Sequence, residues 1–410
     1  MSAKEIIVKE KIASIFLLLP VILVWTPTVT SGLKFDVFGF PYFWPSFIYL
    51  IYYWLSPKRR LSQSSYILVR LVTLVLLISP FSLVFFNNGD YAFSLFFHSL
   101  SFFIILYIFI LKPPTENQIH YLKWIIIGLY FYVEIQAILS TLGIWQYSEV
   151  ELEDRAMSFF RARTKVGDSN QTCAILYLFT ILITSYYVKN TLFNLSIILL
   201  TFITITMCAV RGAFLTMIIY MFVYFYTLFK KSRLIYKFIF FIGITFIVGY
   251  VYNLGIFDDI LLRSEILSSH GDITAGREDR VDYVFKTAVT DSPIIGVGTG
   301  RVYPTTHTLA KSSNDGFRYS SYIAAPHNVW VLFLGEFGIV GVICFLISAF
   351  LIVKKLSFKE PISWAVICVF LINMNTEAIL IHGEVLTFIC LLICASIYTS
   401  KNRVKSNLIV

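Results

Sequence analysis

The sequence predicts an all-α integral membrane protein with about 12 transmembrane helices and a large, partly helical periplasmic or extracellular loop. Hydrophobic residues make up 58% of the 410 residues and charged residues only 14%, whereas soluble domains carry about 25% charged residues. Apolar runs recur along the chain at about the 20-residue length that crosses the hydrocarbon core of a bilayer. This composition excludes a soluble enzyme, a nucleic-acid-binding domain and a disordered protein.

Twelve apolar segments are predicted to span the membrane. They divide the chain into nine spans within residues 1–255, a large outer loop at 256–326 and three spans within 327–410. A smaller outer loop is predicted at about 145–170. The predicted spans are 12–29, 38–55, 66–86, 91–111, 124–144, 171–188, 191–209, 213–229, 234–255, 327–353, 361–380 and 385–399.

The distribution of Lys and Arg predicts the orientation of these spans. With the N-terminus in the cytoplasm, the inner segments hold 18 Lys and Arg, whereas the short outer turns hold one, Lys34. Cytoplasmic loops of membrane proteins carry such an excess of basic residues. An even number of spans returns the C-terminus to the cytoplasm, so we expect a multi-pass membrane protein with both termini inside.

The outer segment at about 145–170 opposes this trend because it is basic. Arg161, Arg163 and Lys165 lie within it on the side that is unfavourable for positive charge. A compensating anion would explain their position. We therefore expect this segment to fold back towards a site that binds a phosphate-containing substrate.

Arg211 lies between two apolar runs at the predicted outer face. Two interpretations stay open for it: an interfacial anchor that snorkels to the headgroups, or a phosphate ligand, because the guanidinium is planar and always charged. The following Gly212 and Ala213 are small enough to let a ligand or another helix approach closely.

The large outer loop contains two patterned stretches. Val284, Ala288 and Val289 follow Arg277 and Arg280 at helical spacing, which predicts an amphipathic helix. Gly296 and Gly298 come next, and such glycines indicate a tight backbone near another group. Either a phosphate cradle or a turn that closes the loop onto the membrane fits this second stretch.

The segment that opens the tenth predicted span carries His327 and Asn328, with Glu336 further along. Imidazole titrates near neutral pH, so His327 is a candidate general base. A carboxylate inside an apolar span is costly unless it has a partner, a cavity or a proton. Glu336 and Glu134 are therefore functional candidates, and Glu377 and His98 are weaker ones.

Taken in order, these motifs resemble the O-antigen polymerase and ligase family of bacterial membrane glycosyltransferases. The resemblance covers roughly residues 155–345. Two of the motifs precede the large loop: a stretch from Arg to Asn before a span, and an Arg-Gly pair at a helix end. The large loop holds a Gly-Arg pair and the stretch Pro-Ile-Ile-Gly-Val-Gly. The last two motifs, His-Asn and a stretch that begins Gly-Glu-Phe-Gly, open the next span. These motifs are Arg163 to Asn170, Arg211-Gly212, Gly276-Arg277, Pro293 to Gly298, His327-Asn328 and Gly335 to Gly341.

The resemblance implies that the enzyme takes a glycan from undecaprenyl pyrophosphate at the outer face of the inner membrane. It implies catalytic roles for His327, Arg211 and Arg277, with the arginines clamping the pyrophosphate. The residues expected to bind substrate are Arg161, Arg163, Asn170, Arg280, Gly296, Gly298, Asn328 and Glu336. The donor is already activated, so no cofactor and no metal are expected.

Three functions compete at this point. A polymerase of a cell-surface polysaccharide, of O-antigen or capsule type, would join one lipid-linked repeat unit to another. A ligase would move the finished glycan to lipid A–core in lipopolysaccharide biosynthesis. A glycolipid flippase would favour internal repeats and short loops, and this sequence shows neither. The expected partners are the lipid-linked oligosaccharide, membrane lipid, and a flippase and a chain-length regulator, with no nucleic acid.

We predict that single cysteines will report residues 256–326 outside the cell. A cysteine at Ser312 should react with a membrane-impermeant maleimide in intact cells, because the basic inner segments fix the orientation. Reaction at this position only after permeabilisation would contradict the topology.

Overall fold

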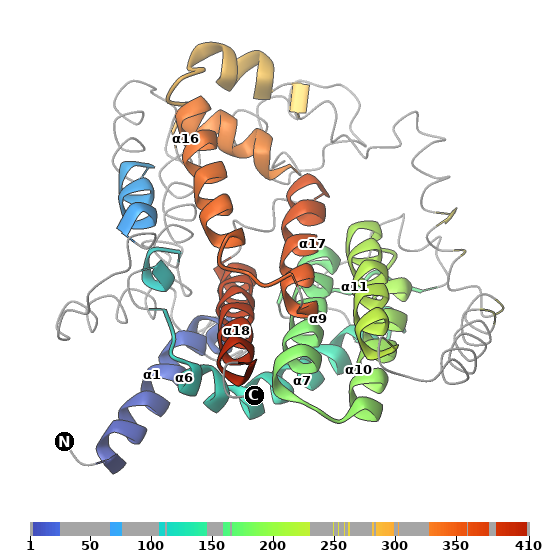
Figure 1. Ribbon diagram of the computed structural model, residues 1–410. Helices are drawn as coiled ribbons and strands as arrows, with labels where there is room; N and C mark the ends of the chain where they lie inside the picture. Colours follow the sequence, from blue (N-terminus) through green and yellow to red (C-terminus); the bar gives the residue numbers. More distant parts are fainter. Residues whose placement is uncertain are drawn as a thin grey trace. The chain divides into compact units, whose positions relative to one another are not determined.

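In the computed structural model, the chain is described over residues 3–24, 66–75, 106–110, 113–145, 159–229 except 165, 281–298 except 283, 328–376 except 359, and 383–407, together with a few single positions. This described part is helical and contains no strand (Figure 1). The prediction of an all-α protein is therefore confirmed for these residues.

The structure forms two compact units. Unit 1 consists of residues 1–121, 274–356 and 374–394, and unit 2 consists of residues 122–273, 357–373 and 395–410. Each unit is described separately below.

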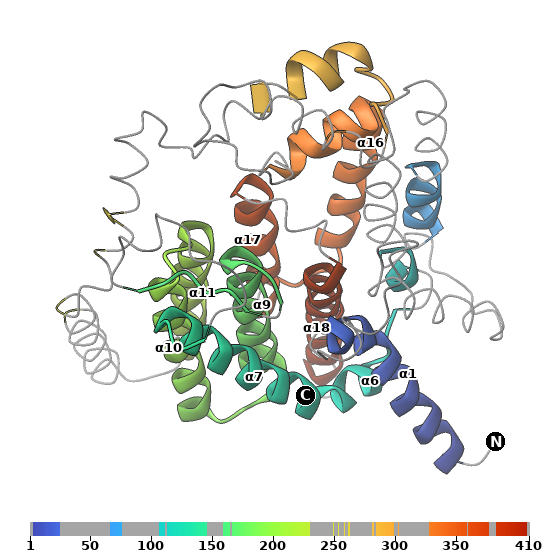
Figure 2. The ribbon, with the colours of Figure 1, turned by 180° about the vertical axis from the view of Figure 1, so that it is seen from behind.

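Unit 2 is built around a bundle of four helices, of which the first crosses the others obliquely and the other three run alternately up and down (Figures 1 and 2). Helix α9 is its central member, because every residue from 172 to 184 along α9 and the π-helical turn after it is buried. The bundle consists of α7 (Lys123–Thr141), α9 (Ser169–Leu182) with the π-turn η1 (Ile183–Tyr187), α10 (Thr191–Met207) and α11 (Arg211–Phe229).

Hydrogen bonds between polar side chains cross the interior of this bundle. The Thr201 hydroxyl of α10 is bonded to the hydroxyl of Tyr130 on α7 at 2.9 Å and to that of Thr180 on α9 at 2.7 Å. One turn further along α10, Thr204 donates to the buried carboxylate of Glu134. Small hydroxyl residues of this kind join helices where no water is present to compete.

Helix α11 is joined to α9 in the same way. The hydroxyl of Tyr220 lies 2.6 Å from that of Thr184 and 2.8 Å from that of Ser185. Where α9 ends, the amide of Asn194 donates to the carbonyls of Thr184 and Val188, at 3.2 and 2.9 Å. The four helices therefore share specific polar contacts as well as apolar packing.

Unit 1 contains α1 (Ala3–Val24), α6 (Glu116–Tyr121) and α16 (Val329–Val353). The Ser14 hydroxyl of α1 donates to the carbonyl of Gln118 in α6, at 3.3 Å. Residues 281–291 form a further helix, the loop helix, which includes the π-turn η2 (Phe285–Val289). Val284 and Ala288 of the loop helix are buried and Phe285 and Lys286 are exposed, so the predicted amphipathic helix is confirmed.

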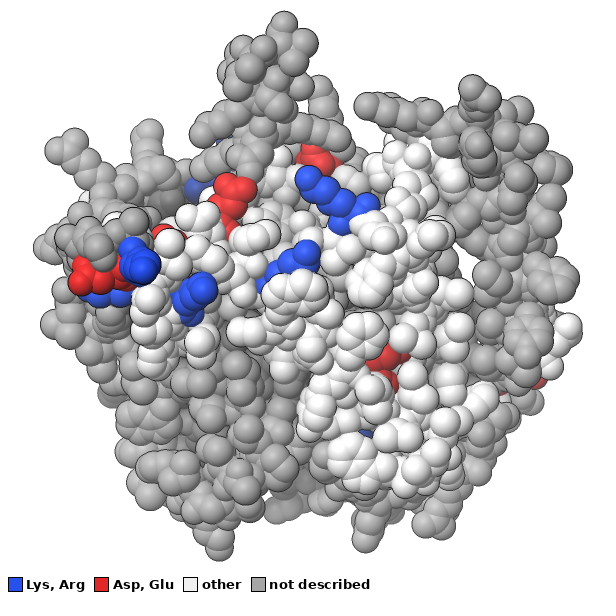
Figure 3. All heavy atoms as spheres, turned by 90° about the horizontal axis from the view of Figure 1, so that it is seen from below, with Lys and Arg blue, Asp and Glu red and all other residues white. Residues whose placement is uncertain are grey.

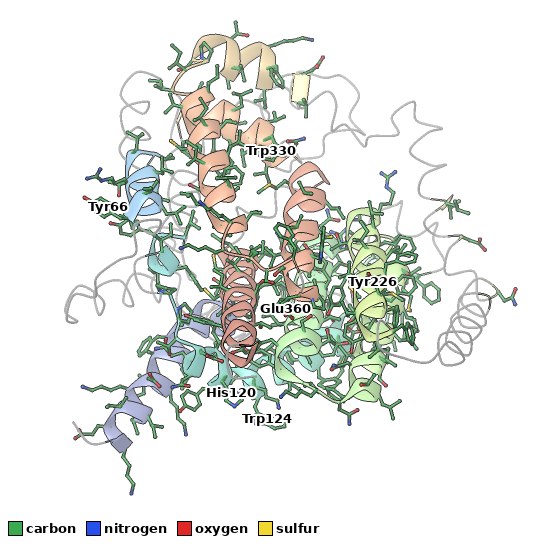
Figure 4. The ribbon with its side chains drawn as sticks, in the orientation of Figure 1. Tyr66, His120, Trp124, Tyr226, Trp330 and Glu360 are labelled. Atoms are coloured by element: carbon green, nitrogen blue, oxygen red, sulfur yellow. The ribbon has the colours of Figure 1, made fainter. Side chains whose placement is uncertain are left out.

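Helices α17 (Pro361–Thr376) and α18 (Gly383–Asn407) complete the described chain. The hydroxyls of Ser363 and Ser396, both in unit 2, are 2.7 Å apart and hydrogen-bonded. Glu360 precedes α17 and is buried (labelled in Figure 4).

The predicted spans agree with the described helices in position. Within the described part, α7, α11 and α16 are long and apolar enough to cross a membrane, and Tyr66–Val75, Thr191–Met207 and Val385–Thr399 are shorter apolar helices. The predicted spans 38–55 and 234–255 lie outside the described residues, apart from single positions. The total of twelve spans stays a prediction.

The predicted span at 327–353 contains a bend that the sequence analysis did not predict. Helix α16 bends at Gly338, which has φ 63° and ψ −165°. The ring centroids of Trp330 and Phe345 are 5.5 Å apart, although 15 residues of straight helix extend about 22 Å. The 329–337 half therefore folds back beside the 339–353 half (Figures 1 and 2). We call this bend the elbow.

We predict that Thr201→Val will destabilise the bundle by about 1 kcal/mol. The substitution removes two interhelical hydrogen bonds, and such bonds contribute on average about 0.6 kcal/mol in membrane proteins. Thermal unfolding in detergent should show a lower Tm than for Thr227→Val, because the Thr227 hydroxyl is bonded only within its own helix, to the Tyr224 carbonyl. Equal Tm values for the two variants would contradict the role of the polar contacts.

Candidate functional site

The basic segment before α9 is folded onto the end of α7. The N–H of Phe160 donates to the carbonyl of Thr141 at 2.9 Å, and the N–H of Arg163 donates to the Ser140 hydroxyl at 2.7 Å. Thr164 and Gly167 then exchange backbone hydrogen bonds across a tight turn, at 3.1 and 3.2 Å. Residues 159–168 therefore lie against the bundle, as the sequence predicts for this part of the outer loop.

Arg161 is buried by this packing and is only 9% exposed. Its Nε is buried and has no hydrogen-bond partner within the described part of the chain. Its guanidinium lies close enough to the Cys173 thiol, in the second turn of α9, to interact with it electrostatically. A buried guanidinium N–H without a hydrogen-bond acceptor is costly, so Arg161 is a candidate to receive an anion.

Asp168 caps the start of α9. Its carboxylate accepts hydrogen bonds from the N–H groups of Asn170 and Gln171, at 2.9 and 3.0 Å, and thereby satisfies two free donors of the first turn. The half-buried side chain of Asn170 makes no hydrogen bond to any described residue. The amide of Asn170 is therefore available to a ligand at this end of the bundle.

Arg211 begins α11 directly after a three-residue turn from α10. The N–H of Ala209 donates to the carbonyl of Thr206 at 3.0 Å, and Ala209 has a left-handed backbone with φ 53°. This conformation is uncommon for a residue other than glycine and costs of order 1 kcal/mol. The strained residue forms the turn that sets the position of Arg211. The side chain of Arg211 is partly exposed.

These residues share one end of the unit 2 bundle. The alternating direction of the helices brings the end of α7, the start of α9, the end of α10 and the start of α11 together. This end, which we call the arginine end, carries Arg161, Arg163 and Arg211 with Asn170. Three permanent cations on two separate segments suit a ligand with several negative charges, such as a pyrophosphate.

The opposite end of the bundle carries lysines instead. Lys123 begins α7 and Lys189 lies between η1 and α10. Trp124, which is 74% exposed, stands beside Lys123, whose Nζ lies 5.2 Å from the centre of its ring (Figure 4). Both basic and acidic side chains are visible among uncharged ones in the view from below (Figure 3). Lysine and an interfacial tryptophan are typical of a cytoplasmic membrane boundary.

Other predicted site residues lie in unit 1. Asn328 caps α16, because its side-chain oxygen accepts from the N–H groups of Trp330 and Val331, at 2.9 and 3.1 Å. Glu336 is 2% exposed and lies two residues before the elbow. Substrate binding by these two residues stays a prediction.

The glycines of the large loop have a structural explanation. Gly298 donates its N–H to the Glu336 carbonyl at 2.9 Å. Gly296 has φ 75°, and a methyl group on it would overlap the backbone of Glu336. Of the two alternatives left open by the sequence, the structure thus has a turn that packs on α16. A phosphate cradle at these glycines stays an untested prediction.

Arg277, Arg280, Lys165 and His327 lie outside the described residues. The sequence analysis did not foresee the hydroxyl groups that line the bundle below the arginine end. Thr201 and Thr204 are three residues apart and therefore share one face of α10. This spacing of hydroxyl residues could have predicted the polar contacts between the helices, which the apolar periodicity alone does not show. Among the described residues, no group of three or more His, Cys, Asp or Glu is placed to hold a metal ion.

Comparison with protein families gives a match to residues 196–346, by a family described as O-antigen ligase. Over these residues the match supports the resemblance to the O-antigen polymerase and ligase family. The match covers less than half of the chain, and it contains Arg211 and the whole of the large loop but not Arg161, Arg163 or Asn170. The family implies a membrane glycosyltransferase-like enzyme. None of the curated proteins compared with the chain matches it.

We predict that replacing Arg161 and Arg163 together by Gln will raise the KM for a lipid-linked donor by at least about tenfold, or abolish turnover. A charge-assisted hydrogen bond contributes about 1.5–3 kcal/mol, and the substitutions remove two cations from the arginine end. Lys189→Gln, at the opposite end of the bundle, is the matched control and should leave KM unchanged. Unaltered kinetics in the double variant would remove this segment from the site.

We predict that Arg211→Lys and Arg277→Lys will each lose activity at matched expression, and that Arg211 will be the less replaceable. Lysine keeps the charge but cannot reproduce the two-pronged contact of a guanidinium with phosphate. Arg70→Lys is a suitable control, because Arg70 is exposed and stacks on Tyr66 at 4.3 Å from the ring centre. Wild-type activity in Arg211→Lys would leave only the anchoring role.

Proposed function

We propose that this protein is a polymerase of a cell-surface polysaccharide of O-antigen or capsule type. It transfers the growing glycan from undecaprenyl pyrophosphate onto another lipid-linked repeat unit. The reaction takes place at the outer face of the inner membrane, in a chain with twelve spans and both termini in the cytoplasm. A flippase that delivers the repeat unit and a chain-length regulator are its expected partners.

The arginine end is the observation that carries this proposal. Arg161 is buried, its Nε has no hydrogen-bond partner among the described residues, and Arg163 and Arg211 lie at the same end of the bundle. A pyrophosphate ester would neutralise these cations when it binds. The same contacts would stabilise the charge that develops on the leaving pyrophosphate as the glycosidic bond breaks.

The two ends of the bundle support the orientation. Lysines and an exposed tryptophan mark one end, and arginines mark the other. If the lysine end is cytoplasmic, as the excess of basic residues in the inner segments favours, then the arginine end faces the side where the lipid-linked repeat unit is presented.

A ligase is the second candidate, because the family that matches residues 196–346 is described as O-antigen ligase. A ligase uses the same donor and would place the same demands on the arginine end. The spaced glycines after Pro293 do not separate the two activities, because their packing against α16 already accounts for them.

Purified protein with a defined undecaprenyl-pyrophosphate oligosaccharide tests the proposal. A ladder of longer lipid-linked glycans is the expected result. Transfer to added lipid A–core without lengthening would identify a ligase instead. The absence of both products, while the donor is consumed by a known polymerase under the same conditions, would overturn the donor chemistry.

We predict that His327→Ala will retain membrane insertion but lose most of the polymer. General-base catalysis contributes typically about 10²–10⁴-fold, and His327 is the candidate that would deprotonate the acceptor hydroxyl. The pH profile of the residual activity separates proton transfer from positioning. A normal chain-length distribution at a normal rate would contradict either role.

A further inference from the structure

The elbow of α16 is closed by main-chain hydrogen bonds from the large loop. Within a helix, the carbonyls of Gly335 and Glu336 would accept from the N–H groups of Ile339 and Val340. Here the carbonyls accept instead from Val297 and Gly298, at 2.8 and 2.9 Å. The two freed N–H groups donate to the carbonyls of Pro293 and Ile294, at 2.9 and 3.2 Å. Four bonds therefore tie residues 293–298 to the elbow.

Close backbone contact at the elbow requires glycine on both sides. A methyl group on Gly338 would overlap the backbone of Ile294, and one on Gly296 would overlap the backbone of Glu336. Both glycines also have positive φ, at 63° and 75°, a conformation that glycine adopts without a steric penalty. The bend is therefore specified by residues from two distant parts of the sequence.

The 329–337 half of α16 is enclosed on two sides. Val331 and Leu332 pack with Val284 and Ala288 of the loop helix in one buried cluster. On another side, the ring of Phe333 lies 4.9 Å from that of Phe345 in the 339–353 half. This half is thus held between the loop and the rest of α16.

The two halves of α16 meet different surroundings. In the 339–353 half, Ile339, Ile343 and Phe350 are 50–64% exposed in the described structure, which suits contact with lipid. This half extends about 22 Å from the elbow, which is less than the hydrocarbon thickness of about 30 Å. Irregular backbone is tolerated at membrane depth only where other protein groups satisfy it, and the four bonds at the elbow meet this condition.

We propose that residues 329–337 form a re-entrant half-helix in the outer leaflet, and that Gly296 and Gly338 are positioning residues for the reaction. They set the position of Asn328, which caps the start of this half-helix. The inference rests on the proposed function for its catalytic part, and its geometric part is independent of activity.

Cross-linking tests the geometry. Cysteines that replace Trp330 and Phe345 should be joined by a short bifunctional thiol reagent, because their rings are in contact. Cysteines that replace Phe214 and Phe229 are the matched control: they have the same separation of 15 residues in the uninterrupted α11, about 22 Å apart. Failure of the first pair, or equal yields for both pairs, would show that α16 is straight and would overturn the proposal.

Depth labelling tests the placement in the membrane. A cysteine at Ile294, which is 63% exposed beside the elbow, should react with a lipid-soluble maleimide but only slowly with an impermeant one. A cysteine at Ser312 should react fast with the impermeant reagent. Equal fast reaction of both positions with it would place the elbow in water and exclude a re-entrant element.

Kinetics test the positioning role. Gly338→Ala should lower kcat by about 10²-fold, the loss that a misplaced reacting group can cause, and leave the donor KM unchanged. Gly128→Ala is the matched control, because a methyl group there would meet nothing within 4 Å. Wild-type kcat in Gly338→Ala would overturn the positioning role, and so would a raised donor KM without loss of kcat. An inactive wild type would instead refute the proposed function.

If the Gly338→Ala variant fails to insert into the membrane, a second pair of cysteines tests whether fixed docking of the loop on α16 is needed for activity. A Cβ on Gly335 would lie 3.6 Å from that of Ala288, within the range for a disulfide. Cysteines at these two positions should therefore form one once the side chains of Val284 and Val302, at 2.9 and 2.7 Å from the new Cβ, shift aside. Activity that persists in the oxidised protein supports a loop that stays docked during turnover. Loss of activity that reduction restores would show that the loop must leave α16, and would overturn fixed positioning.

Discussion

The need to satisfy every main-chain polar group away from water governs this structure. An unpaired N–H or C=O in hydrocarbon costs several kcal/mol, so a helix in a membrane bends only where other groups replace its lost bonds. At the elbow of α16 the replacements come from the large loop, in four hydrogen bonds. Residues 293–298 of the loop and the elbow of the tenth predicted span are consequently parts of one structural element, although 36 residues lie between Gly298 and Gly335.

The same constraint shapes the side chains of the unit 2 bundle. Hydroxyl groups find partners across the helices, as Thr201 does with Tyr130 and Thr180. Arg161 differs, because no described residue accepts from its buried Nε. Several buried polar atoms lack a hydrogen-bond partner in the described structure. Arg161 is the one that we assign to a charged substrate, because its guanidinium is permanently charged and lies at the arginine end.

The lengths of the apolar runs predicted the positions of the helices well. A helix that crosses the hydrocarbon core needs a continuous apolar run of a set length, and such runs can be seen directly in the sequence. The predicted span at 191–209 corresponds to Thr191–Met207 and that at 213–229 to Arg211–Phe229. The positions of Arg161 and Arg211 at a common end follow from the alternating direction of such helices. The elbow was not predictable, because glycine permits a positive φ without requiring it and its partner segment lies far away in the sequence.

The bonds at the elbow join backbone to backbone, and this has a consequence for how the protein can evolve. Apart from proline, every residue offers the same main-chain groups, so outside Gly296 and Gly338 the contact constrains the spacing of the two segments more than the identity of their side chains. Ile294, whose side chain is largely exposed, is free to drift to other apolar residues. A single-residue insertion between Pro293 and Gly298 would shift every bond out of register at once. Proteins that diverge from this chain should therefore differ in residue identity within 293–298 while keeping the length of this segment.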